Sequence, residues 1–233
     1  MENCLLVLGV GRSGTSSLGK GLAEQIGRYI PEPWRPKHPE YEKNSNVFFK
    51  NLENETNIVV KTLLIQKPIF YSESKLVDFF IELIDKFGIN NTILIGRKNL
   101  QEHIVSQINL QYRVDLKHQY QNRVTAQQYH LNKHSIDNSW RIDDIPISYF
   151  EDKKLRSKIL TELEIQNDNL FKVSEIFKKE IVWYEELYGE NRNLSLDIIK
   201  SWKFDNIEIN CKQLNNYLNP KYRYNKTKNN RLI

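Results

Sequence analysis

The stretch "LLVLGVGRSGTSSLGKGL", residues 5–22, decides the fold of this chain. Residues 4–10 are a continuous apolar run, which is typical of a strand buried on both faces of a parallel sheet. A turn rich in glycine and hydroxyl residues follows, and residues 15–27 carry apolar side chains at helical spacing. A strand, a glycine-rich turn and a helix in this order commonly hold a phosphate group. The stretch therefore predicts an anion-binding turn beside a parallel sheet.

The rest of the first half continues this pattern of buried strands and helices. Apolar runs at 57–65 and 91–97 predict two more strands, and residues 74–88 and 99–116 predict the helices that alternate with them. Residues 28–43 contain four prolines and predict a loop. We therefore expect an α/β fold, a three-layer sandwich with a central, mainly parallel sheet.

The second half is more polar and mostly helical. Residues 153–179 predict one or two helices, 180–189 begin as a strand, and 193–204 predict a helix. No repeat or linker interrupts the chain, so we expect residues 1–233 to form a single domain. Aromatic and cationic residues are dense in 107–141, which indicates either an acceptor-binding or lid segment or an ordinary polar surface, and residues 220–233 form a basic tail.

Composition limits the class of protein but does not name its partner. Hydrophobic residues make up 39% of the chain and charged residues 27%, as in globular proteins. The net charge of +5 favours anionic partners. No secretory signal or apolar run of about 20 residues is visible, so we expect a cytoplasmic protein without a membrane span. The two cysteines and the histidines lack metal-site spacing, so we expect no metal.

Three phosphate-binding templates compete for the first turn, beside a plain connecting turn. Gly9, Gly11 and Gly14 match the dinucleotide pattern GxGxxG, but the acidic residue expected about 20 positions later is missing from the proline-rich segment. The Walker pattern GxxxxGK[ST] fits except that Thr15 replaces the lysine that reaches the β- and γ-phosphates. A third template keeps a cation, here Arg12, inside the turn itself.

The sequence "GVGRSGTSSL" resembles the third template, the 5′-phosphosulfate loop of the sulfotransferases that use 3′-phosphoadenosine 5′-phosphosulfate. The likeness is strongest to carbohydrate and Nod-factor sulfotransferases, and it implies their P-loop NTPase-like fold. Amide groups beside a helix N-terminus, the Arg12 guanidinium and the hydroxyls at the turn's end suit an oxyanion. The resemblance implies that the donor is bound by Gly11, Arg12, Ser13, Gly14, Thr15 and Ser16.

Two later segments resemble further donor-binding elements of that family. In "TILIGRKNLQEHIVSQ", Arg97 and Ser106 resemble the pair that binds the donor's 3′-phosphate. Lys98 is the alternative cation, but Arg97 ends the strand and can bind bidentately. In "VWYEELYG", Tyr184 matches a segment that packs near the nucleotide.

The catalytic base is expected at Glu32. Cytosolic aryl and steroid sulfotransferases carry a histidine after "KT", whereas "IVVKTLLI" keeps Lys61 and Thr62 but has Leu63 there. Carbohydrate-type members place a glutamate after the first helix, and "YIPEPWRP" resembles that segment. The resemblance therefore implies Glu32 as base, with Arg12 and Lys61 stabilising charge on the sulfuryl and leaving oxygens.

The activity implied is transfer of a sulfuryl group from 3′-phosphoadenosine 5′-phosphosulfate to a hydroxyl or amine, releasing adenosine 3′,5′-bisphosphate. The expected partner is a small-molecule or saccharide acceptor, without metal or nucleic acid. A P-loop nucleotide or nucleoside kinase and a non-catalytic nucleotide-binding relative are the alternatives. A nucleic-acid-binding module fits the net charge alone, because no signature of such a module is present.

Overall fold

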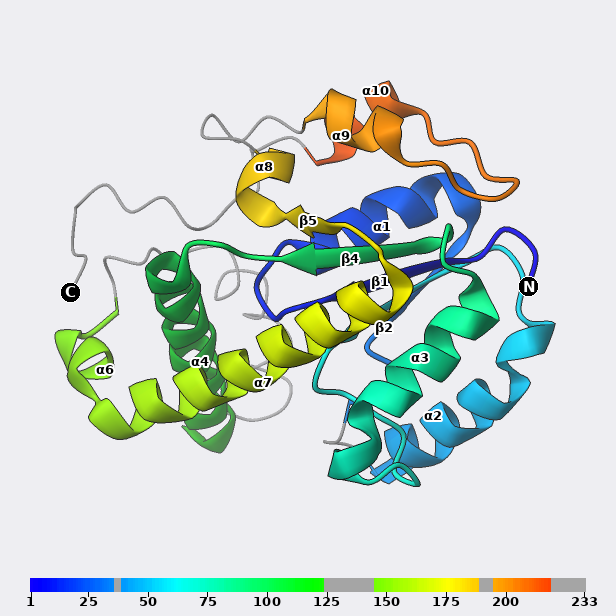
Figure 1. Cartoon of the computed structure of the whole chain (residues 1–233). Coiled ribbons are helices and arrows are strands. Elements are labelled where there is room, and N and C mark those ends of the chain that lie inside the picture. Colours follow the sequence, from blue (N-terminus) through cyan, green and yellow to red (C-terminus); the bar gives the residue numbers. More distant parts are fainter. Residues whose placement is uncertain (36–38, 124–144, 189–194, 219–233) are drawn as a thin grey trace. The chain divides into compact units, whose positions relative to one another are not determined.

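The computed structural model describes residues 1–35, 39–123, 145–188 and 195–218 (Figure 1). The expected tail 220–233 and most of the expected 107–141 segment lie outside these residues or have side chains that are not described. The chain divides into two compact units, Met1–Lys98 with Glu162–Pro220 and Asn99–Thr161 with Lys221–Ile233.

The elements of the chain follow one another in this order: β1 (Leu5–Gly9), α1 (Thr15–Ile26), β2 (Arg28–Pro31), α2 (Pro39–Asn51), η1 (Leu52–Asn54), β3 (Ile58–Leu63), η2 (Glu73–Lys75), α3 (Leu76–Phe87), β4 (Thr92–Gly96), α4 (Leu100–Arg123), α6 (Ile147–Glu151), α7 (Lys153–Phe177), β5 (Ile181–Trp183), α8 (Tyr184–Tyr188), α9 (Leu196–Ser201) and α10 (Cys211–Tyr217). None of the helices within the described ranges combines the length and apolar character that a membrane crossing demands.

The five strands of the first unit form one all-parallel sheet in the order β2-β3-β1-β4-β5. The expected α/β class with a central parallel sheet is confirmed. Strands β1 and β4 are buried along their whole length, because helices cover both faces of the sheet. Leu5 and Val7 pack with α1, α9 and α10 on one face, and α3 lies across the other (Figure 1).

The expectation of a loop over residues 28–43 is wrong at both ends. Residues 28–31 form β2, and α2 begins at Pro39. Pro31 is tolerated because β2 is an edge strand and Pro31 is its last residue. Pro39 is tolerated because the first residue of a helix needs no intrahelical N–H bond. Because these prolines lie at the margins of β2 and α2, the sequence between them was mistaken for part of one continuous loop.

The second unit contains α4, α6 and the start of α7. Tyr149 donates its hydroxyl to Asp115 Oδ2 at 3.0 Å, and Gln111 donates to Asp115 Oδ1 at 2.7 Å. Burial and the Asp115 carboxylate raise the pKa of Tyr149 to about 12. This local network links α6 to α4 within the unit.

The strand order places a topological switch point at the carboxyl ends of β1 and β4. The chain leaves β1 toward β2 on one side of the sheet and leaves β4 toward β5 on the other. Ligands of open α/β sheets bind where neighbouring strands have connections of opposite direction. In the dinucleotide-binding fold the second strand pairs directly with the first, whereas here β3 lies between them. The arrangement therefore fits the dinucleotide template poorly.

Candidate functional site

The turn between β1 and α1 is a tight cradle built on backbone strain and close packing. Arg12 has φ 65° and Gly14 has φ 79°, so both lie in the left-handed region. A Cβ on Gly14 would lie 2.6 Å from Cε2 of Tyr188, which requires glycine there. A non-glycine residue held at positive φ often marks a functional turn.

The helix end of the cradle carries donors and no carboxylate. Leu18 is the residue whose N–H bonds back to Gly14, at 3.1 Å, so the N–H groups of Thr15, Ser16 and Ser17 precede the first bond within the helix. No side chain caps α1, and no acidic residue lies in its first turn. The positive end of the helix dipole is therefore available to an anion at this point.

The residues of the predicted loop do not all face the same way. Ser13 is fully buried, and both its N–H and its hydroxyl donate to the carbonyl of Val10, so its donors serve the turn. Thr15 is also buried, whereas Ser16 is exposed on α1. The N–H of Gly11 donates to Oε1 of Gln166 at 2.8 Å. Gln166 stands on α7 far along the chain, and no sequence signal pointed to it.

Arg97 lies beside the cradle at the end of β4. Its Nη1 donates to the carbonyl of Arg12 at 3.3 Å, and its guanidinium carbon lies 4.7 Å from the Tyr184 ring centroid. Its Nε is 3.7 Å from Oε1 of Glu185. The side chain of Arg97 is only 7% exposed. Arg97 therefore contacts both the backbone of Arg12 and the ring of Tyr184.

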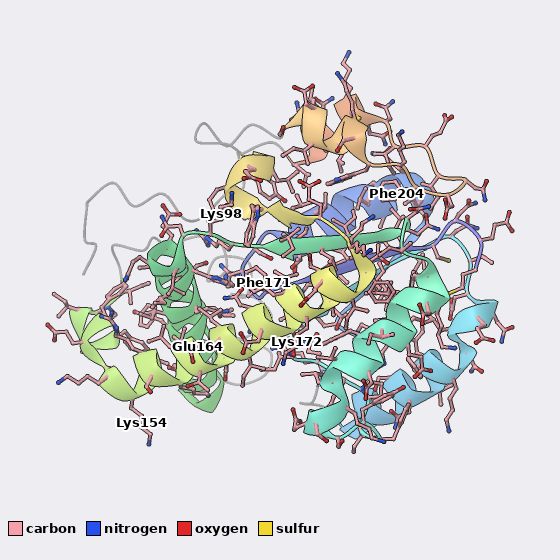
Figure 2. All side chains as sticks on the ribbon, viewed as in Figure 1. Lys98, Lys154, Glu164, Phe171, Lys172 and Phe204 are labelled. Carbon is pink, nitrogen blue, oxygen red and sulfur yellow. The ribbon has the colours of Figure 1, made fainter. Side chains whose placement is uncertain are left out.

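Lys98 has a more open setting than Arg97. Its backbone N–H donates to Glu185 at 3.0 Å, and its ammonium group pairs with Glu186. The ammonium also lies 5.4 Å from the Trp183 ring centroid. Figure 2 labels Lys98, which follows strand β4. The Lys98 side chain is 51% exposed and is held by the segment after β5. Ser106, expected to act with one of these cations, belongs to α4 in the second unit, which is described separately.

Tyr184 and Tyr188 cover the glycine of the cradle. Their ring centroids are 4.9 Å apart, and the Tyr188 hydroxyl donates to the carbonyl of Gly14 at 3.2 Å. Sequence reasoning singled out Tyr184 and missed Tyr188. The helical spacing of four residues between them was the signal that could have found it.

Glu32 and Lys61 form an ion pair at the ends of β2 and β3. Lys61 is buried, with 2% of its side chain exposed, and donates to Oε1 of Glu32. The N–H of Glu32 donates to the carbonyl of Lys61 at 2.6 Å, and Glu32 has φ 49°. Gln66 donates to Oε2 of Glu32 at 2.9 Å, and Arg35 Nε lies 4.0 Å from the same oxygen. Sequence reasoning missed Gln66 and Arg35.

Burial and neighbouring charges shift the pKa values of both Glu32 and Lys61. Burial raises the pKa of Glu32, but Lys61, Gln66 and Arg35 outweigh burial and hold it below its ordinary value. Burial lowers the pKa of Lys61; Glu32 opposes this shift, while the charges of Arg35 and Arg12 add to it. The field of Arg12 thus reaches Lys61, which links the pair to the cradle. Glu32 is ionised at neutral pH and can accept a proton.

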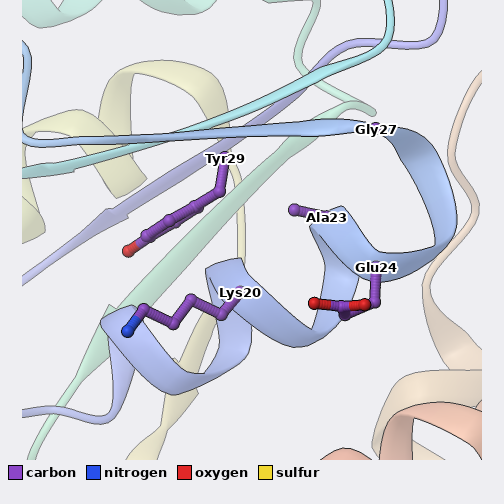
Figure 3. A pocket seen from close by; sticks show the side chains of 5 residues that line it. All are labelled: Lys20, Ala23, Glu24, Gly27 and Tyr29. Carbon is purple, nitrogen blue, oxygen red and sulfur yellow. The ribbon is translucent and has the colours of Figure 1, made fainter.

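A pocket within the described residues lies elsewhere on α1. It has a volume of about 350 Å³ and is lined by Lys20, Ala23, Glu24, Gly27 and Tyr29 (Figure 3). These residues lie on α1 from Lys20 onward, at the end of that helix and in β2, whereas the cradle precedes the first residue of α1. This pocket holds none of the predicted site residues.

The fold and site define an α/β protein with an all-parallel sheet and an arginine-bearing turn at its switch point. Comparison of the chain with family models, curated proteins and solved structures yields no match. The geometry of the site and the sequence motifs are therefore the basis for inferring the function.

Proposed function

We propose that this protein is a sulfotransferase that transfers a sulfuryl group from 3′-phosphoadenosine 5′-phosphosulfate to a hydroxyl or amine of an acceptor. One observation carries the proposal: Arg97, at the end of β4, donates to the carbonyl of Arg12 in the turn after β1. Two cationic residues at the switch point of the sheet suit a nucleotide with separate 5′ and 3′ anionic groups. The family resemblance names that nucleotide.

In this proposal the cradle binds the 5′-phosphosulfate through the first amides of α1 and the Arg12 guanidinium. Arg97 binds the 3′-phosphate, and Tyr184 packs near the nucleotide. A carboxylate, Glu185, lies close to Arg97 and orients it. The donor is a substrate of the reaction, and positioning with charge stabilisation supplies most of the catalysis.

The transfer step uses Glu32 and Lys61. The acceptor oxygen or nitrogen attacks sulfur, the bond from sulfur to the phosphate oxygen breaks, and adenosine 3′,5′-bisphosphate leaves. Glu32 takes the acceptor's proton, while Lys61 and Arg12 stabilise negative charge on the sulfuryl and leaving oxygens. Glu32 is a weak base because Lys61 and Gln66 favour its ionised form.

A second candidate is a nucleotide-binding protein without transfer activity. The engagement of both Glu32 oxygens, by Lys61 and by Gln66, favours it, because an acceptor proton must compete with these donors. A kinase has less support, since Thr15 occupies the position of the Walker lysine.

A thermal-shift comparison followed by a transfer assay separates these functions. Ligand binding to the folded state raises its melting temperature. We expect adenosine 3′,5′-bisphosphate to stabilise the protein more than ATP with Mg²⁺ or NAD. Transfer of ³⁵S from labelled donor to a panel of phenols, amines and saccharides then identifies an enzyme. Stabilisation by ATP with Mg²⁺ alone contradicts the proposal, and stabilisation by bisphosphate without transfer favours the second candidate.

A further inference from the structure

Gln66 forms a closed set of hydrogen bonds at the end of β3. Its Oε1 accepts from the Leu63 N–H and from the Thr62 hydroxyl, each at 3.1 Å. Its own N–H donates to the carbonyl of Leu63 at 2.9 Å, so the residue closes a tight turn. The side chain is buried. Burial and three local bonds leave it little freedom to reorient.

This bonding fixes which end of the Gln66 amide meets Glu32. A carbonyl oxygen accepts about two hydrogen bonds. Since the Leu63 N–H and the Thr62 hydroxyl supply both, the amide nitrogen must point away from them. It donates to Oε2 of Glu32 at 2.9 Å. A flipped amide would set its oxygen against Oε2 of Glu32 and its NH2 group against the Leu63 N–H.

We infer that Gln66 is a positioning residue for Glu32, holding its carboxylate in a single orientation opposite Lys61. This inference rests on the sulfotransferase function proposed above. Lys61 engages Oε1 from β3, and Gln66 engages Oε2 from the turn that follows. The carboxylate is thereby held from two sides by groups on one stretch of chain, residues 61–66. Glu32 itself stands at positive φ, where few backbone states are available.

Charged groups also act on Glu32, so a test must change the Gln66 amide and leave every charge in place. Lys61 faces Glu32 from β3, and Arg35 lies three residues after Glu32 in the chain. Arg12 acts on Lys61 from the turn after β1. Gln66→Met removes the amide dipole and its donors but keeps the side-chain length and every charge. The matched control is Gln25→Met, because Gln25 also makes two bonds, to the backbone of Asn210.

The first measurement is an NMR titration of ¹³C-labelled glutamate carboxyls, with the Glu32 resonance assigned by Glu32→Gln. A hydrogen bond donated to a carboxylate favours the ionised form. We therefore expect Glu32 to titrate at higher pH in Gln66→Met than in the wild type, and Gln25→Met to leave it unchanged. If Gln66→Met fails to fold, Gln66→Glu replaces it, and the second carboxylate is expected to raise the titration further. An unchanged Glu32 titration overturns the inference.

The second measurement is the pH profile of ³⁵S transfer. Gln66→Met should move the acidic limb of kcat/KM to higher pH and lower kcat about tenfold or more, since small misplacements of a reacting group are costly. The KM of the donor should change little. If the acidic limb of the kcat/KM profile is the same in Gln66→Met and the wild type, the role of Gln66 is overturned while the sulfotransferase proposal survives. Absence of transfer and of bisphosphate binding, with a shifted Glu32 titration, overturns the proposed function instead.

Discussion

The carbonyl of Arg12 accepts a hydrogen bond of 3.3 Å from Nη1 of Arg97, across the ends of two neighbouring parallel strands. The contact joins the turn after β1 to the end of β4. It orients the Arg97 guanidinium and also stabilises the left-handed backbone of Arg12. Under the proposed function both cations serve one nucleotide, so a change at either should affect the same ligand.

Arg97→Lys should weaken binding of adenosine 3′,5′-bisphosphate at least about tenfold, because lysine cannot bind a phosphate bidentately. Adenosine 5′-monophosphate, which lacks the 3′-phosphate, should bind both proteins nearly equally. Isothermal titration calorimetry with the two ligands isolates the 3′-phosphate contribution. Lys98→Ala is the control, since Lys98 is half exposed and paired with Glu186. A larger loss in Lys98→Ala, or equal losses for both ligands, would reverse our assignment of the cation.

Arg12→Gly tests the cradle's cation without adding backbone strain, because glycine readily adopts the φ of 65° found at Arg12. We expect kcat/KM for ³⁵S transfer to fall about 10²–10³-fold, the usual cost of removing one transition-state donor. The melting temperature should stay level or rise. Arg28→Ala is the control, since Arg28 lies on β2 and pairs with Glu55. Near-normal transfer in Arg12→Gly would count against the assignment.

The sequence predicted β1, β3 and β4 because their residues are almost all buried and mostly apolar. Residues 4–10, 57–65 and 91–97 contain β1, β3 and β4. The edge strand β2 escaped prediction, because its Arg28 and Pro31 are exposed and lack that apolar signal. Residues 180–189 were expected to begin as a strand, and the three residues of β5 lie at the start of that range.

The site was predictable where its residues are close in sequence or match a motif. Arg12, Glu32, Lys61 and Arg97 were named from such motifs. Gln166 binds the cradle across 155 positions of the chain, so only the packing of α7 in the folded protein brings it there. Gln66 has no motif either, because its role depends on which end of an amide faces Glu32.

Glu32→Gln should destabilise the fold by about 2 kcal/mol, because it leaves the buried Lys61 ammonium without its carboxylate. Breaking a fully buried ion pair costs about 3–5 kcal/mol of stability. We expect a smaller loss here because 22% of the Glu32 side chain is exposed. The double variant Glu32→Gln with Lys61→Met should recover most of the loss. Urea unfolding measures these differences, and Glu53→Gln at the surface pair with Lys86 is the control. A Glu32→Gln variant no less stable than the control would mean that the pair contributes nothing.

The pH dependence of the free energy of unfolding should show the contribution of the same Glu32–Lys61 pair. Because the pKa of Glu32 is lower in the folded state than its ordinary 4.5, the unfolded state binds more protons as the solution is acidified. Its stabilisation is therefore complete above that ordinary value and is lost as the pH falls through the folded value. The stability difference between the wild type and Glu32→Gln should therefore shrink progressively as the pH falls below the ordinary value of 4.5. Urea unfolding at several pH values checks this, and a constant difference would contradict it.

Gly14→Ala should destabilise the fold, because an alanine there combines backbone strain with a steric clash. Gly14 has φ 79° and ψ 2°, so an alanine incurs a left-handed strain of about 1–2 kcal/mol. Its Cβ would also lie 2.6 Å from Cε2 of Tyr188, which must move. We expect a total loss of about 2 kcal/mol or more in urea unfolding. The variant should also weaken bisphosphate binding, because Tyr188 cannot shift without disturbing Tyr184 and the Gly14 carbonyl. A loss no larger than the strain, with bisphosphate binding unchanged, would show that backbone strain alone requires glycine here and that the two tyrosines do not shape the cradle.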